Sequence, residues 1–69
     1  MDNIATRIKE LRLEKKMSQA QLGQVIGVND RTISNYESGK REPDIQTIKK
    51  LCDFFEVSSD YLLGFAEDY

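Results

Sequence analysis

The chain has 69 residues, of which 32% are charged, and its formal net charge is −2. One cysteine and no histidine exclude a disulfide framework and a metal site built from His and Cys ligands. No apolar run reaches the length of a membrane span, and the charged start does not resemble a signal peptide. We therefore expect one small cytoplasmic domain over residues 1–69, with its core in 4–64 and a short tail at 65–69.

The charged side chains are unevenly distributed along the chain. Residues 1–41 hold eight basic and five acidic side chains, a net charge of +3, whereas residues 42–69 carry −5. DNA responds to the local field of a protein, so a basic front part is compatible with a nucleic-acid partner despite the acidic total.

Apolar spacing predicts helices throughout, because no window alternates with a period of two. The first helix is expected over residues 3–15, with Ile4, Ile8 and Leu11 on one stripe. Three later helix starts share a device in which an apolar residue precedes a capping residue. A second apolar residue follows five positions after the first, which is the spacing of a hydrophobic staple. The three apolar and capping pairs are Met17-Ser18, Val28-Asn29 and Val57-Ser58.

Residues 19–38 are the most informative stretch, because they predict two short helices joined by a tight turn. Small residues are expected where the helices cross closely, at Ala20, Gly23 and Gly27. The apolar residues expected to pack on the core are Leu22, Val25, Ile26, Val28, Ile33 and Tyr36. The second helix, about residues 30–37, keeps a polar outer face whose side chains can read base edges in a DNA major groove. This reading face consists of Asp30, Arg31, Thr32, Ser34 and Asn35.

The remaining elements follow from turn and capping signals. Gly39 is expected to end the second of these helices in a left-handed conformation, and Pro43 to open another helix near Asp44. The apolar stripe of that helix is expected to contain Ile45, Ile48, Leu51, Cys52 and Phe55, with Cys52 as a small buried hydrophobe. The last helix is expected over residues 59–63, ended by Gly64. Around it, some of Tyr61, Leu62, Leu63 and Phe65 must close the core, and the others are candidates for a dimer contact.

Three motifs, SQAQLGQVIGV, TISNYESGKREP and VSSDYLLG, stand in this order between Ser18 and Gly64, within a match that runs from about Ile4 to Gly64. With them the chain resembles the lambda-repressor-like (Cro/C1-type, XRE family) helix-turn-helix domains, and the last motif resembles phage or mobile-element repressors. The resemblance implies an all-α bundle of five helices, in which helices 2 and 3 form the helix-turn-helix. It also implies that the helix of about residues 30–37 lies in the major groove.

Residue roles divide between base edges and phosphates. Arg31 can donate two bonds to guanine, and Asn35 can pair with adenine. Asp30 can accept from cytosine or simply favour the helix N-terminus, and the methyl group of Thr32 can touch a thymine methyl. The resemblance adds phosphate contacts, and Asn29 is expected to cap the helix and to be within reach of the DNA backbone. The residues assigned to phosphate by resemblance are Gln19, Ser38, Lys40 and Arg41.

The resemblance further implies an ion pair between Arg12 and Glu37, which we interpret as architecture rather than as a DNA contact. The function expected is a bacterial or phage-encoded transcriptional repressor, located at the nucleoid, that binds a palindromic operator in double-stranded DNA as a homodimer. No cofactor, metal, membrane or small-molecule ligand is expected. Without a histidine base, a framed nucleophile or a glycine-rich phosphate loop, an enzyme is not expected either. The acidic balance leaves one alternative open, a protein-interaction module or antitoxin-type partner with weak or no DNA binding.

Overall fold

Capping residues set the helix starts in the computed structural model, which describes residues 3–69. These residues form five helices and no strand. An Asn, Ser or Asp side chain accepts a backbone N–H at the start of each helix, and Ser18 with Gln21 forms the predicted capping box. The helices are α1 (Ile4–Glu14), α2 (Gln19–Ile26), α3 (Asp30–Ser38), α4 (Ile45–Phe55) and α5 (Ser59–Leu62). The apolar residues of the three predicted staples belong to the core or pack against it, and the predicted stop at Gly39, with φ of 80°, is confirmed.

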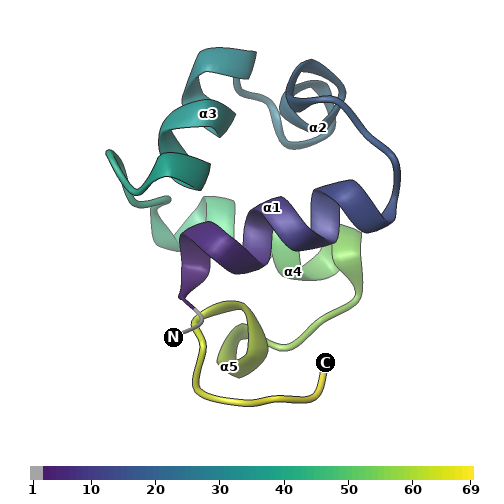
Figure 1. Ribbon diagram of the computed structural model, residues 1–69, viewed down its shortest axis with the longest axis vertical. Coiled ribbons are helices and arrows are strands. Elements are labelled where there is room, and N and C mark those ends of the chain that lie inside the picture. The colour runs from purple at the N-terminus through teal and green to yellow at the C-terminus, as the bar shows by residue number, and fades with distance from the viewer. Residues whose placement is uncertain (1–2) are drawn as a thin grey trace.

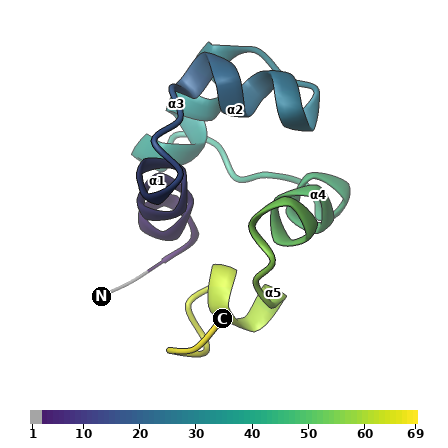
Figure 2. The same cartoon turned by 90° about the vertical axis from the view of Figure 1, so that its right-hand side faces the viewer.

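The helices form three layers, with α2 and α3 at the top, α1 and α4 in the middle, and α5 below (Figures 1 and 2). Close packing of α2 on the turn before α3 depends on Gly23. A Cβ atom at this position would collide with the backbone carbonyl oxygen of Val28. The close approach predicted at Gly23 is therefore confirmed. Helix α3, which follows this turn, lies at the outer edge of the molecule (Figure 1).

The core is apolar and draws on all five helices. Its fully buried side chains are Ile8, Leu22, Ile33, Leu51 and Leu62. Tyr61 also closes the core, whereas Leu63 and Phe65 stay exposed, Phe65 to 82%. None of the described helices has both the length and the apolar character needed to cross a membrane.

Several burial predictions were wrong. Val25 and Ile45 are 49% and 74% exposed, because they lie at the edges of their apolar stripes, on the solvent side. Ala20 is exposed, so it does not lie at the helix crossing. Gly27 ends α2 with φ of +83°, and a Cβ atom there would meet only the Lys50 Nζ atom at 3.9 Å, so Gly27 serves as a left-handed cap and not as a close crossing. Cys52 is half-buried, and its burial raises the pKa of the thiol.

The tail folds back along the molecule. The backbone N–H of Ser58 donates to the carbonyl of Tyr69 at 2.7 Å, and the Tyr69 hydroxyl donates to the Glu14 carboxylate at 3.0 Å. Arg7 of α1 is buried against this tail. Its guanidinium lies 3.9 Å from the centre of the Tyr61 ring and donates a hydrogen bond to the carbonyl of Ala66. Arg7 is one of the eight basic side chains of residues 1–41, but its burial makes it part of the core and not of the basic surface.

Candidate nucleic-acid interface

Helix α3 lies at the upper left edge of the bundle in Figure 1, and the side chains of its reading face are exposed or partly exposed. Ile33 and Tyr36 are buried against the bundle, which turns Arg31 to solvent and leaves Asn35 partly exposed. Within residues 3–69, the side chains of Arg31, Asn35 and Ser34 make no hydrogen bond or ion pair. Their donors and acceptors are therefore available to a ligand. Asp30 is exposed in the first turn, where a carboxylate also interacts favourably with the helix dipole.

Asn29 and Thr32 are engaged with each other at the start of α3. The Asn29 side-chain oxygen Oδ1 accepts two hydrogen bonds of 2.8 Å, one from the backbone N–H of Thr32 and one from its hydroxyl. This confirms Asn29 as the cap of the helix. The Asn29 amide nitrogen stays available as a donor, whereas the only donor of the Thr32 side chain is used.

A buried ion pair fixes α3 to α1. The Nε and Nη2 atoms of Arg12 donate to the two carboxylate oxygens of Glu37 at 2.7 and 3.0 Å, and Nη1 donates to the carbonyl of Met17 at 2.7 Å. The two side chains are only 10% and 5% exposed. The hydrogen bond with Glu37 raises the pKa of Arg12, and this outweighs the opposite effect of burial. The expected pair is present, and it sets the position of the reading face.

Gln19 belongs to the same network, which the sequence did not indicate. Its Nε2 donates to Glu37 Oε1 at 3.2 Å. Because a carboxylate only accepts, this bond fixes the amide orientation and leaves the second N–H of Nε2 as a donor. Gln19 borders a hollow of about 280 Å³ that Lys9, Ser34 and Ser38 also line.

Lys9 is a candidate that the sequence reasoning did not single out. It lies in α1 three positions before Arg12, so both side chains lie on the same side of the helix. Since the resemblance places Arg12 against Glu37 of α3, the three-residue spacing from Lys9 to Arg12 is a sequence signal that Lys9 also lies beside α3.

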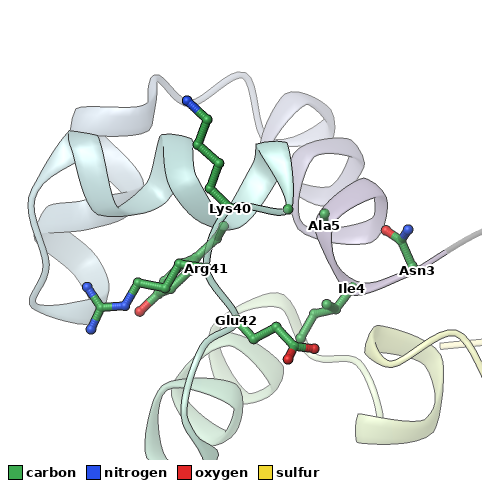
Figure 3. A pocket seen from close by; sticks show the side chains of 8 residues that line it. Asn3, Ile4, Ala5, Lys40, Arg41 and Glu42 are labelled. Atoms are coloured by element: carbon green, nitrogen blue, oxygen red, sulfur yellow. The ribbon is translucent and has the colours of Figure 1, made fainter.

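The loop after α3 adds two cations. The backbone N–H groups of Lys40 and Arg41 donate to the carbonyl of Asn35, and the Ser38 hydroxyl donates to the same oxygen at 3.3 Å. The side chains of Lys40 and Arg41 diverge at the edge of a hollow of about 380 Å³ beside the start of α1 (Figure 3). Since they point in different directions, they are suited to separate anions. Arg41 also contributes to lowering the pKa of Asp44, after the hydrogen bonds from Thr47.

Helix α3 thus presents exposed hydrogen-bond donors and the cation Arg31, and the loop after it adds Lys40 and Arg41. No group of three or more His, Cys, Asp or Glu side chains that could hold a metal ion is present in residues 3–69. Such an arrangement is suited to binding an extended polyanion with exposed polar groups.

Residues 8–62 match the family model described as Helix-turn-helix, and the chain belongs to this family, in its XRE/Cro-C1-type form. Over 62 residues it is 36% identical to the HTH-type transcriptional regulator ImmR of Bacillus subtilis, an alignment covering 90% of this chain and 49% of ImmR. The chain thus spans about half the length of that curated relative. The predicted fold class is confirmed.

The fold is similar to those of two solved structures. The P22 c2 repressor in complex with a synthetic operator has a TM-score of 0.88 and 32% identity, covering 96% of this chain and all of the other. Hydroxypropylphosphonic acid epoxidase from S. wedmorenis has a TM-score of 0.78 at 23% identity, and the match covers 87% of this chain and 32% of the enzyme. The likeness to the epoxidase concerns the fold alone, as part of a larger chain.

Proposed function

We propose that this chain binds specific sequences in double-stranded DNA through α3 and acts as the DNA-binding domain of a transcriptional repressor. One observation carries the proposal: Arg31 and Asn35 stand on the outer side of α3 with no partner among the described residues, on a helix fixed by the Arg12–Glu37 pair. The P22 c2 repressor, which has the same fold, is in complex with operator in its structure. A regulator of this kind is not an enzyme, and its place is the bacterial cytoplasm.

Two sets of residues divide the work in this proposal. Arg31 pairs with guanine and Asn35 with adenine, while Asp30 accepts from cytosine and Ser34 takes either a donor or an acceptor. The other set holds phosphates and sets the register of α3 on the duplex. It consists of Gln19, Asn29, Ser38, Lys40 and Arg41, to which we add Lys9 because it lines the hollow beside Gln19.

We further propose that the protein binds as a two-fold homodimer, with half-sites about 34 Å apart. Leu63 and Phe65 support this, because both are exposed apolar side chains next to α5. Sedimentation of the protein with its duplex is expected to give two chains per duplex.

The proposal is tested by selecting binding sites from a random duplex library at low salt, where phosphate attraction is strongest. A palindromic consensus supports an operator-binding dimer. Absence of any enrichment would contradict the repressor function and favour a protein-interaction module on the same fold. Selection with the Lys49→Ala variant is the control and is expected to give the same result as wild type. Lys49 is an exposed cation of α4 that the proposal does not use.

A further inference from the structure

The bond between Asn29 and Thr32 determines what Thr32 can offer to a ligand. Its hydroxyl donates to Asn29 Oδ1 at 2.8 Å, so the side chain has no donor left for a base or a phosphate. The Thr32 methyl group occupies another staggered position on the same Cβ atom. An internal hydrogen bond and β-branching together fix the side-chain rotamer, so the methyl group has one defined position.

Thr32 is flanked by the two principal readers of α3. It directly follows Arg31 and lies three positions before Asn35, and its side chain is only half-buried. The start of α3 therefore combines a donor-rich side chain, an apolar methyl group and an amide on adjacent helix positions.

In the major groove, the apolar group that marks a base is the C5-methyl of thymine. 5-Methylcytosine carries the same group, whereas cytosine and uracil lack it. We infer that the methyl group of Thr32 recognises a pyrimidine C5-methyl group at one position of each half-site. This inference rests on the proposed DNA binding of α3, and it makes affinity sensitive to a methyl group at that position.

The test uses the duplex selected from the random library and replaces each thymine in turn by uracil, which removes only the methyl group. Three proteins are compared: wild type, Thr32→Ser, which keeps the hydroxyl bond to Asn29, and Thr32→Val, which keeps a methyl group. Uracil at one position is expected to weaken binding by wild type and Thr32→Val about fourfold, the effect of one buried methyl-sized group. Binding by Thr32→Ser is expected to be equal on thymine and uracil at that position.

A second experiment tests whether the methyl group of 5-methylcytosine is recognised in the same way as that of thymine. At the same position, a cytosine duplex is compared with a 5-methylcytosine duplex, and wild type is expected to prefer the methylated form by a similar factor. Thr32→Ser is expected to bind both alike.

The outcomes distinguish this inference from the proposed function. If uracil substitution affects all three proteins equally, or none of them, Thr32 does not read the methyl group, although the selected duplex is still bound. If no duplex is selected at all, the proposed function fails and the inference fails with it. Thermal unfolding of the three proteins checks that the comparison is made between folded domains.

Discussion

Arg12 and Glu37 form a two-bond ion pair that joins α1 to α3, 25 residues apart in the sequence, with both side chains largely buried. The third Arg12 bond, to the carbonyl of Met17, ties in the turn before α2. Gln19 adds a bond from the start of α2 to the same carboxylate. One carboxylate thereby fixes the two helices of the helix-turn-helix to the rest of the bundle.

Removing one member of this pair is expected to destabilise the protein strongly. Arg12→Met leaves Glu37 as an uncompensated buried charge and is expected to lower the free energy of unfolding by about 3–5 kcal/mol. The double variant Arg12→Met/Glu37→Leu is expected to recover much of this loss, because no buried charge remains. Urea unfolding measures both, and a single-variant cost below about 1 kcal/mol would show that the pair is solvated.

A methyl group at position 23 is expected to disrupt the packing of the helix-turn-helix. In Gly23→Ala the new Cβ meets the backbone carbonyl of Val28, which cannot move aside as a side chain would. Overpacking of this kind costs about 1–3 kcal/mol. Ala20→Ser is the matched control, because Ala20 is exposed on the same helix and is expected to tolerate the change. Equal thermal stabilities of the two variants would contradict the close approach.

The cap of α4 predicts a dependence on acid. The backbone N–H of Thr47, and then its hydroxyl, lower the pKa of Asp44 below its ordinary value of 3.8. A lowered pKa in the folded state contributes stability above the ordinary pKa, and this is lost as the pH falls through the folded value. Asn is as good an N-cap residue as Asp, but its side chain does not titrate. The free energy of unfolding of Asp44→Asn is therefore expected to rise relative to that of wild type as the pH falls below about 4. If the free energies of unfolding of Asp44→Asn and wild type differ by the same amount at every pH, the Asp44 carboxylate does not make this contribution.

Lys40 is expected to contribute through phosphate rather than through bases. Lys40→Ala is expected to weaken binding to all duplexes by a similar factor and to reduce the slope of log K against log salt by about 0.9 for each bound chain, about 1.8 for the homodimer. Lys49→Ala removes the same charge from α4 and is expected to leave that slope unchanged. Titrations at several salt concentrations measure both slopes. A Lys40→Ala slope equal to that of wild type would remove Lys40 from the interface.

The helix boundaries could be predicted from the sequence because they depend on local chemistry. Ser18, Asn29 and Ser58 each cap a helix through a bond three residues away, and Gly39 needs only its own left-handed φ. The fold class followed from these signals and from the resemblance. The Arg12–Glu37 pair joins distant parts of the chain and followed from the resemblance alone.

Burial was harder to predict, because it depends on which neighbours cover the edge of a helix. Val25 and Ile45 have apolar side chains at helical spacing, but no element covers them. Arg7 shows the opposite case, in which a charged side chain is buried because the Tyr61 ring and the Ala66 carbonyl lie beside it. The bond from Gln19 to Glu37 joins α2 to α3, 18 residues apart in the sequence, and has no local signal.

The central claim is that α3 reads bases through Arg31 and Asn35. The most direct measurement is the affinity of Arg31→Ala and Asn35→Ala for the selected duplex and for all single-base variants of it. Each variant is expected to lose about 1–3 kcal/mol of binding free energy per half-site of the selected duplex and to stop discriminating between bases at one position of each half-site, a guanine for Arg31 and an adenine for Asn35. If both variants keep the base preferences of wild type at every position, α3 does not read the sequence through these side chains.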